Sequence, residues 1–166
     1  MSRLVKPEGV GKTRDRLARS VILALRELAA HNKPDAQARD LVAYMSLALD
    51  EIDKTIEETC SAWEKRDYWI KADQFRTQWA WTRSLSIRLA RVAQEEHWID
   101  LPRLMPELAD KLGSVTLPKR NGLGQPWVGA YARLLERRPQ SPPVSTPEAM
   151  PVLSSWRPRP KKTASG

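Results

Sequence analysis

The sequence predicts an all-α fold, a helical bundle built on a long pair formed by its second and third helices. Apolar residues recur at spacings of three and four over most of the chain, and no alternating segments joined by hairpin turns occur. The 166 residues are 41% apolar and 29% charged, which is typical of a soluble globular domain with its own core. We expect a flexible basic leader over 1–12, a single helical domain over 13–138 and a disordered tail over 139–166.

The first two helices are separated by a proline. The first is expected to begin after Thr13 as N-cap and to end near His31, because the residue before Pro34 avoids the helical region. The second opens at Pro34–Asp35 and runs to about Arg66 with an unbroken apolar stripe. At 1.5 Å per residue it is about 45 Å long.

The third helix is expected over 68–96 and carries apolar residues on two sides. Such a helix is either central in a bundle or exposes a contact surface, and burial between neighbours is the favoured interpretation. The preceding junction, 64–67, lacks glycine and proline. The sequence therefore leaves open whether the chain turns sharply there or merely kinks.

Shorter elements complete the domain. A helix is expected over about 102–112 with Gly113 as its stop, then a connector over 114–125, and a last helix that starts at Pro126. The final 28 residues hold seven of the thirteen prolines and four cations against Glu148. A segment of this composition buries too little apolar surface to offset its ordering entropy, which predicts the disordered tail.

Charge is unevenly distributed along the chain, which carries a net +8. Residues 1–33 hold eight cations against three anions, whereas residues 34–66 hold four against eight. We expect the first and last helices to lie beside the acidic second helix. The excess cations are expected on the connectors and the tail.

Patterns that would indicate catalysis are incomplete. The Gly11-Lys12-Thr13 triplet has Lys6 where a phosphate-binding loop needs glycine, and too few residues precede it for a strand. The carboxylates of the second helix alternate with Lys54 and are interpreted as a solvated face. Cys60 lies on the apolar stripe, where cysteine acts as a small hydrophobe. We therefore expect no enzyme activity, no cofactor and no metal.

The leading hypothesis is a non-enzymatic accessory protein that binds nucleic acid or a ribonucleoprotein assembly nonspecifically through basic patches. Three arginines of the third helix share an arc of about 80°, and a basic glycine-bearing loop follows later in the chain. Guanidinium groups contact phosphates, and an exposed tryptophan stacks on bases. The predicted nucleic-acid-binding residues are Arg76, Arg83, Arg91, Lys119, Arg120 and Trp69.

The alternative is a protein–protein adaptor or homo-oligomeric scaffold that uses the second apolar side of the third helix. Aromatic residues outside a core mark contact surfaces. Its predicted interaction residues are Ile70, Trp81, Leu85 and Val92.

The stretch 63–76, which reads WEKRDYWIKADQFR, together with Gly9-Val10-Gly11-Lys12, resembles an uncharacterised family of small all-α bacterial proteins with no assigned activity. The likeness covers residues 3–135 and implies a bacterial origin and no functional residues. No apolar run reaches the roughly 18 residues of a membrane helix, and the N-terminus lacks a signal-peptide core. We expect a cytoplasmic protein without a membrane partner.

Overall fold

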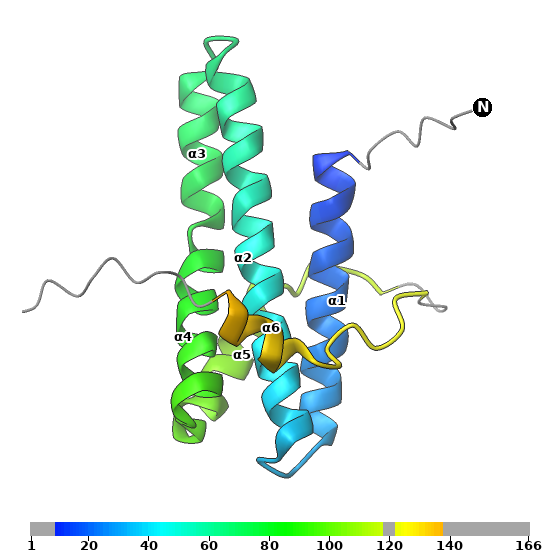
Figure 1. Cartoon of the computed structure of the whole chain (residues 1–166). Helices are drawn as coiled ribbons and strands as arrows, with labels where there is room; N and C mark the ends of the chain where they lie inside the picture. The colour runs from blue at the N-terminus through cyan, green and yellow to red at the C-terminus, as the bar shows by residue number, and fades with distance from the viewer. Residues whose placement is uncertain (1–8, 118–121, 138–166) are drawn as a thin grey trace, which may run out of the picture. The chain divides into compact units, whose positions relative to one another are not determined.

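The computed structural model describes residues 9–117 and 122–137, which are helical or irregular and contain no strand (Figure 1). The predicted all-α bundle is confirmed for this part of the chain, whereas the predicted tail over 139–166 lies outside it. The helices are α1 Val10–Ala30, α2 Ala36–Glu64, α3 Trp69–Trp79, α4 Trp81–Glu95, the short 3₁₀ helix η1 Trp98–Asp100, α5 Leu101–Lys111 and α6 Ala130–Glu136.

Helix α2 is the centre of the bundle and contacts α1, α3, α4 and α6. Its buried side follows the apolar stripe of the sequence, and the fully buried large side chains of this stripe are Leu41, Met45, Leu49, Ile52 and Ile56. As expected from the charge distribution, the first and last helices both lie against α2. The pairing of α2 with the following helices is also confirmed.

Helix α1 begins earlier than the sequence predicted. Gly9 is the residue before the first helical turn, and the Thr13 backbone N–H donates to the Gly9 carbonyl at 3.0 Å. Thr13 is therefore inside the helix, and its assignment as N-cap was wrong. The additional turn closes backbone hydrogen bonds without a side-chain cap. Residues 10–12, assigned to the leader, belong to α1, so the Gly11-Lys12-Thr13 triplet is helical.

Both ends of α2 are defined by specific contacts. The Asp35 carboxylate accepts a hydrogen bond from the Ala38 N–H at 3.0 Å, which confirms the predicted start. At the other end, Tyr68 N donates to the Trp63 carbonyl at 2.9 Å and Asp67 N to the Glu64 carbonyl at 3.0 Å. With Asp67 at φ 64°, this is a Schellman motif that uses aspartate in the left-handed position. The junction is thus a sharp turn.

The third predicted helix is two helices, α3 and α4, that meet at Ala80. The Ala80 N–H reaches the Thr77 carbonyl at 3.4 Å, and the Thr82 hydroxyl donates to the Trp79 carbonyl at 2.8 Å. Such side-chain bonds to the preceding turn bend helices. The prediction of one uninterrupted helix over 68–96 was wrong at this point.

Helix α5 agrees with the prediction to within one residue at each end, but α6 starts at Ala130 rather than Pro126. Gly129 has φ 75°, so the residues before it form a turn instead of a first helical turn. The Asp40 carboxylate of α2 accepts hydrogen bonds from Gly129 N at 3.2 Å and Tyr131 N at 2.9 Å. An acidic residue of α2 therefore holds the start of α6.

Buried hydroxyl groups fix the neighbours of α2. Ser46 donates to the Ser86 carbonyl at 2.7 Å, and Ser86 donates to the Ser46 carbonyl at 2.8 Å, which joins α2 to α4. On the other side, the Tyr44 hydroxyl donates to Ser20 of α1 at 2.7 Å. These contacts orient α1 and α4 about α2 and decide which of their side chains face outward.

Candidate nucleic-acid interface

Arg76, the first of the three predicted arginines, is paired with acidic residues of α2. Its Nε lies 3.1 Å from a Glu57 carboxylate oxygen and its Nη1 2.6 Å from Glu64. The hydrogen bonds that Arg76 donates to Glu64 and then to Glu57 raise the pKa of this guanidinium. Arg76 therefore joins α3 to α2 and is not available as a free phosphate contact.

The other two arginines, both on α4, are also near carboxylates. Arg91 pairs with Glu95 at 3.3 Å within the same helix, and its side chain is exposed. Arg83 lies near Asp53 of α2: burial raises the pKa of Asp53, and the positive charge of Arg83 opposes part of that rise. The sequence predicted that the three guanidinium groups form one positive surface. In the structure they do not form a continuous free positive strip.

The physical reason is the α2–α3 hairpin. The predicted arc followed from the spacing of the arginines alone and took no account of carboxylates on a neighbouring helix. The sharp turn after Glu64 lays α3 against α2, whose Glu57 and Glu64 bind Arg76. The positive charge of Arg76 is therefore balanced by carboxylates of α2.

The remaining predicted nucleic-acid-binding residues are Lys119, Arg120 and Trp69. Lys119 and Arg120 lie outside the described residues. Trp69 stands at the start of α3 with 59% of its surface exposed, beside the turn from α2. It is therefore accessible, as the hypothesis required, but Arg76 on the same helix is directed to α2.

The four predicted interaction residues are in three different environments. Leu85 and Val92 are fully buried in the core, which confirms the favoured interpretation of burial and removes them from any accessible contact surface. Trp81 is half-buried and stacks on Trp79 with ring centroids 5.8 Å apart. Ile70 is 77% exposed. The structure therefore does not form one apolar contact face from these residues.

A different basic surface emerges on α1. Four cations recur at spacings of four, three and seven, which places them within about 80° of one another on the outer side of the helix. The opposite side carries Val21 and Ala24, which are fully buried. We call this set the α1 basic row; it consists of Lys12, Arg16, Arg19 and Arg26.

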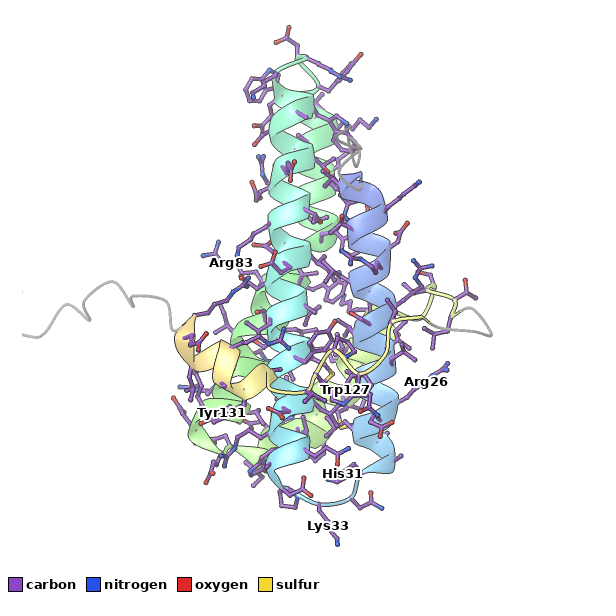
Figure 2. All side chains as sticks on the ribbon, turned by 45° about the vertical axis from the view of Figure 1, so that its right-hand side comes forward. Arg26, His31, Lys33, Arg83, Trp127 and Tyr131 are labelled. Atoms are coloured by element: carbon purple, nitrogen blue, oxygen red, sulfur yellow. The ribbon has the colours of Figure 1, made fainter. Side chains whose placement is uncertain are left out.

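The C-terminal member of the row, Arg26, points away from the acidic helix. Figure 2 shows Arg26 directed away from α2 on the far side of α1, whereas Arg83 lies on the other side of α2. Among the described residues, Lys12, Arg19 and Arg26 form no ion pair. In both figures the residues from 122 to the start of α6 cross α1. Leu23, which lies between Arg19 and Arg26 in the row, is half-buried.

Arg14 lies on the side of α1 that faces α2, unlike the cations of the row. This side chain turns inward, where Nη2 donates to the Thr59 hydroxyl at 2.9 Å and Nε to the Thr55 hydroxyl at 3.2 Å. Its guanidinium also lies 5.0 Å from the centre of the Phe75 ring. Burial lowers the pKa of Arg14. Arg14 thus ties α1 to α2 and α3 while the row faces outward.

Sequence reasoning missed the row, although the signal was present. Residues 1–33 showed the largest excess of cations, but the first helix was expected to start only after Thr13 and was assigned to neutralise the second. With the start at Val10, Lys12 joins the helix, and the spacing 12, 16, 19, 26 becomes one outer face.

A second group of arginines surrounds a hollow of about 220 Å³ between α4 and α5. Arg88, Arg91 and Arg103 line it together with Asp100. Arg88 is bound by both carboxylate oxygens of Glu107, at 2.9 and 3.0 Å. Carboxylates accompany these arginines, and on α1 the exposed Asp15 and Glu27 flank the row.

Comparisons with known proteins add no relative. No family model, curated protein or solved structure matches the chain. Within residues 9–117 and 122–137, none of the helices has the length and apolar character needed to cross a bilayer. The same part of the chain contains no group of three or more histidine, cysteine or acidic residues placed to hold a metal ion.

Proposed function

We propose that this protein is a non-enzymatic, cytoplasmic accessory protein that binds nucleic acid, alone or within a ribonucleoprotein assembly, through the α1 basic row. The observation that carries the proposal is the outward row of cations on a helix whose other side is packed in the core. Such a surface contacts the phosphate backbone without reading the sequence.

The dimensions of the row suit a polyanion. Lys12 and Arg26 are 14 residues apart, which corresponds to about 21 Å along the helix axis. Phosphates recur every few ångströms along a nucleic-acid strand, so a strand laid along α1 brings several phosphates near the row.

The adaptor alternative required four residues on one accessible face. Two of them, Leu85 and Val92, lie in the core, so we favour the nucleic-acid proposal.

The test is the salt dependence of binding to a fluorescent duplex oligonucleotide, measured by anisotropy. Three to four phosphate contacts predict a slope of about −3 for log K against log salt, or about sixty-fold weaker binding at 200 mM than at 50 mM salt. A row variant with Lys12→Gln, Arg19→Gln and Arg26→Gln is expected to lose most of this slope.

A matched control separates the row from net charge. A variant with Arg91→Gln, Arg103→Gln and Lys111→Gln loses the same charge from exposed positions on α4 and α5. It should keep the wild-type slope. Equal losses in the two variants would show attraction to overall charge alone, and absence of wild-type binding at low salt would refute the proposal.

A further inference from the structure

The turn between α2 and α3 carries the densest group of exposed apolar side chains in the described part of the chain. Tyr68, Trp69 and Ile70 follow one another, with exposed fractions of 55%, 59% and 77%. The other exposed large apolar side chains are spread singly over α4, η1 and the region of α6. A contiguous exposed patch marks an interaction site, whereas scattered residues do not.

Cations surround this patch. Lys65 and Arg66 precede it and Lys71 follows it, and all three are exposed, with Asp67 as the one anion of residues 65–71. We call residues 65–71 the α2–α3 tip. It combines a bulky apolar centre with a net positive rim.

The tip is held rigidly before any partner arrives. The Schellman motif fixes the backbone through the bonds from Tyr68 N and Asp67 N to carbonyls of α2. The Lys71 ammonium lies 4.3 Å from the centre of the Trp63 ring, which anchors the first turn of α3 to the end of α2. A preformed patch loses little entropy on binding.

We infer that the α2–α3 tip docks this protein onto an anionic lipid surface. Tryptophan and tyrosine favour the water–bilayer interface, an isoleucine beside them is buried among acyl chains, and lysine and arginine attract anionic headgroups. The inference is independent of the proposed function, because none of the tip residues belongs to the α1 basic row.

Shape and chemistry favour a lipid surface over the other partners. The tip is the end of a helical hairpin that stands beyond the start of α1 (Figure 1), so it meets a plane with its outermost side chains. Base stacking would use the aromatic rings and leave Ile70 in water. A lipid interface uses all three apolar side chains and the cations together.

The experiment is co-sedimentation of the full chain with phosphatidylcholine vesicles and with vesicles that also contain phosphatidylglycerol. Wild type is expected to bind the anionic vesicles and only weakly the neutral ones. A tip variant, Trp69→Ser with Ile70→Ser, should partition at least about tenfold less, because two apolar side chains no longer enter the interface. These side chains are exposed, so the helical circular dichroism should be unchanged.

The matched control is Ile87→Ser with Ile99→Ser, which removes two exposed isoleucines outside the tip. It should bind vesicles like wild type. The row variant should also keep vesicle binding at physiological salt while it loses the oligonucleotide, which separates the two proposals.

Three results would overturn the inference. Wild type that binds neither vesicle refutes it directly. A tip variant that binds anionic vesicles like wild type shows adsorption by general charge. A tip variant whose vesicle binding is intact but whose oligonucleotide affinity or oligomeric mass falls assigns the tip to base stacking or to self-association instead.

Discussion

The reciprocal hydrogen bonds between Ser46 and Ser86 give a sharp prediction about how α4 is held on α2. Each hydroxyl donates to the other residue's carbonyl, at 2.7 and 2.8 Å, and both residues are buried. Each carbonyl also accepts the N–H four residues later in its own helix. The two hydroxyls are also 3.4 Å apart, so replacing one serine by alanine removes its bond to the facing carbonyl together with this contact. Neither change leaves a buried polar group unpaired.

The expected cost follows from these contacts. One such hydrogen bond contributes about 1 kcal/mol, so Ser46→Ala and Ser86→Ala should each lower the free energy of unfolding by about that amount. The double variant should cost less than the sum of the two, because the contact between the hydroxyls is lost in either single variant. For a domain of this size, 1 kcal/mol corresponds to about 3–4 °C in Tm. Urea unfolding followed by tryptophan fluorescence measures these differences. Ser84→Ala, on the exposed side of α4, is the control and should change little.

The double-mutant cycle also contains the refutation. If both single variants match Ser84→Ala in stability, α2 and α4 do not meet at these serines, and the assignment of outward residues on α4 is wrong. A single variant that costs as much as the double variant would show that the two bonds are not independent.

Four further predictions concern individual side chains. Arg76→Gln should leave the salt slope of oligonucleotide binding unchanged, because Glu57 and Glu64 already bind this guanidinium. A reduced slope, measured by anisotropy, would show that Arg76 contacts the oligonucleotide. Asp40→Ala should increase amide hydrogen exchange at Tyr131, whose N–H it accepts; equal exchange rates would contradict this. Hydrogen bonds from Ala38 N and then from His31 lower the pKa of Asp35, so its stabilisation is present above the ordinary pKa of 3.8 and is lost as pH falls through the lowered folded value. Thermal unfolding should therefore show the advantage of wild type over Asp35→Asn shrinking in acid, and a constant difference would argue against the cap. Burial raises the pKa of Cys60, whose Sγ donates to the Ala72 carbonyl, so a thiol reagent should modify it only on unfolding; fast labelling of the folded chain would show that α3 opens.

The helices themselves could be predicted because their apolar stripes are long and regular. The stripe of α2 from Leu41 to Ile56 is the core of the structure, and the start of α2 near Pro34–Asp35 was predicted from the sequence. The acidic character of α2 also correctly indicated which helices lie beside it. These features are local or depend on periodicity alone.

Features that depend on tertiary contact or on one dihedral angle could not be predicted. The turn at Asp67 uses a left-handed aspartate where the usual signal is glycine, and the break at Ala80 depends on hydroxyl bonds of Thr82. The pairing of Arg76 with Glu57 also required knowing that α3 folds back along α2.

The candidate site was therefore only partly within reach of the sequence. The basic excess near the N-terminus was evident, but its outward direction depends on α1 starting at Val10 and on Val21 facing α2. The sequence also identified Trp69 and Ile70 individually, without showing that the turn presents them side by side with Tyr68.

Amide chemical-shift mapping of the full chain with a duplex oligonucleotide tests most directly whether the α1 basic row is the binding surface. The largest shifts are expected at the outward positions of α1 from Lys12 to Arg26, and they should disappear as salt is raised. Shifts confined to α3 and α4, or no shifts at low salt, would contradict this expectation.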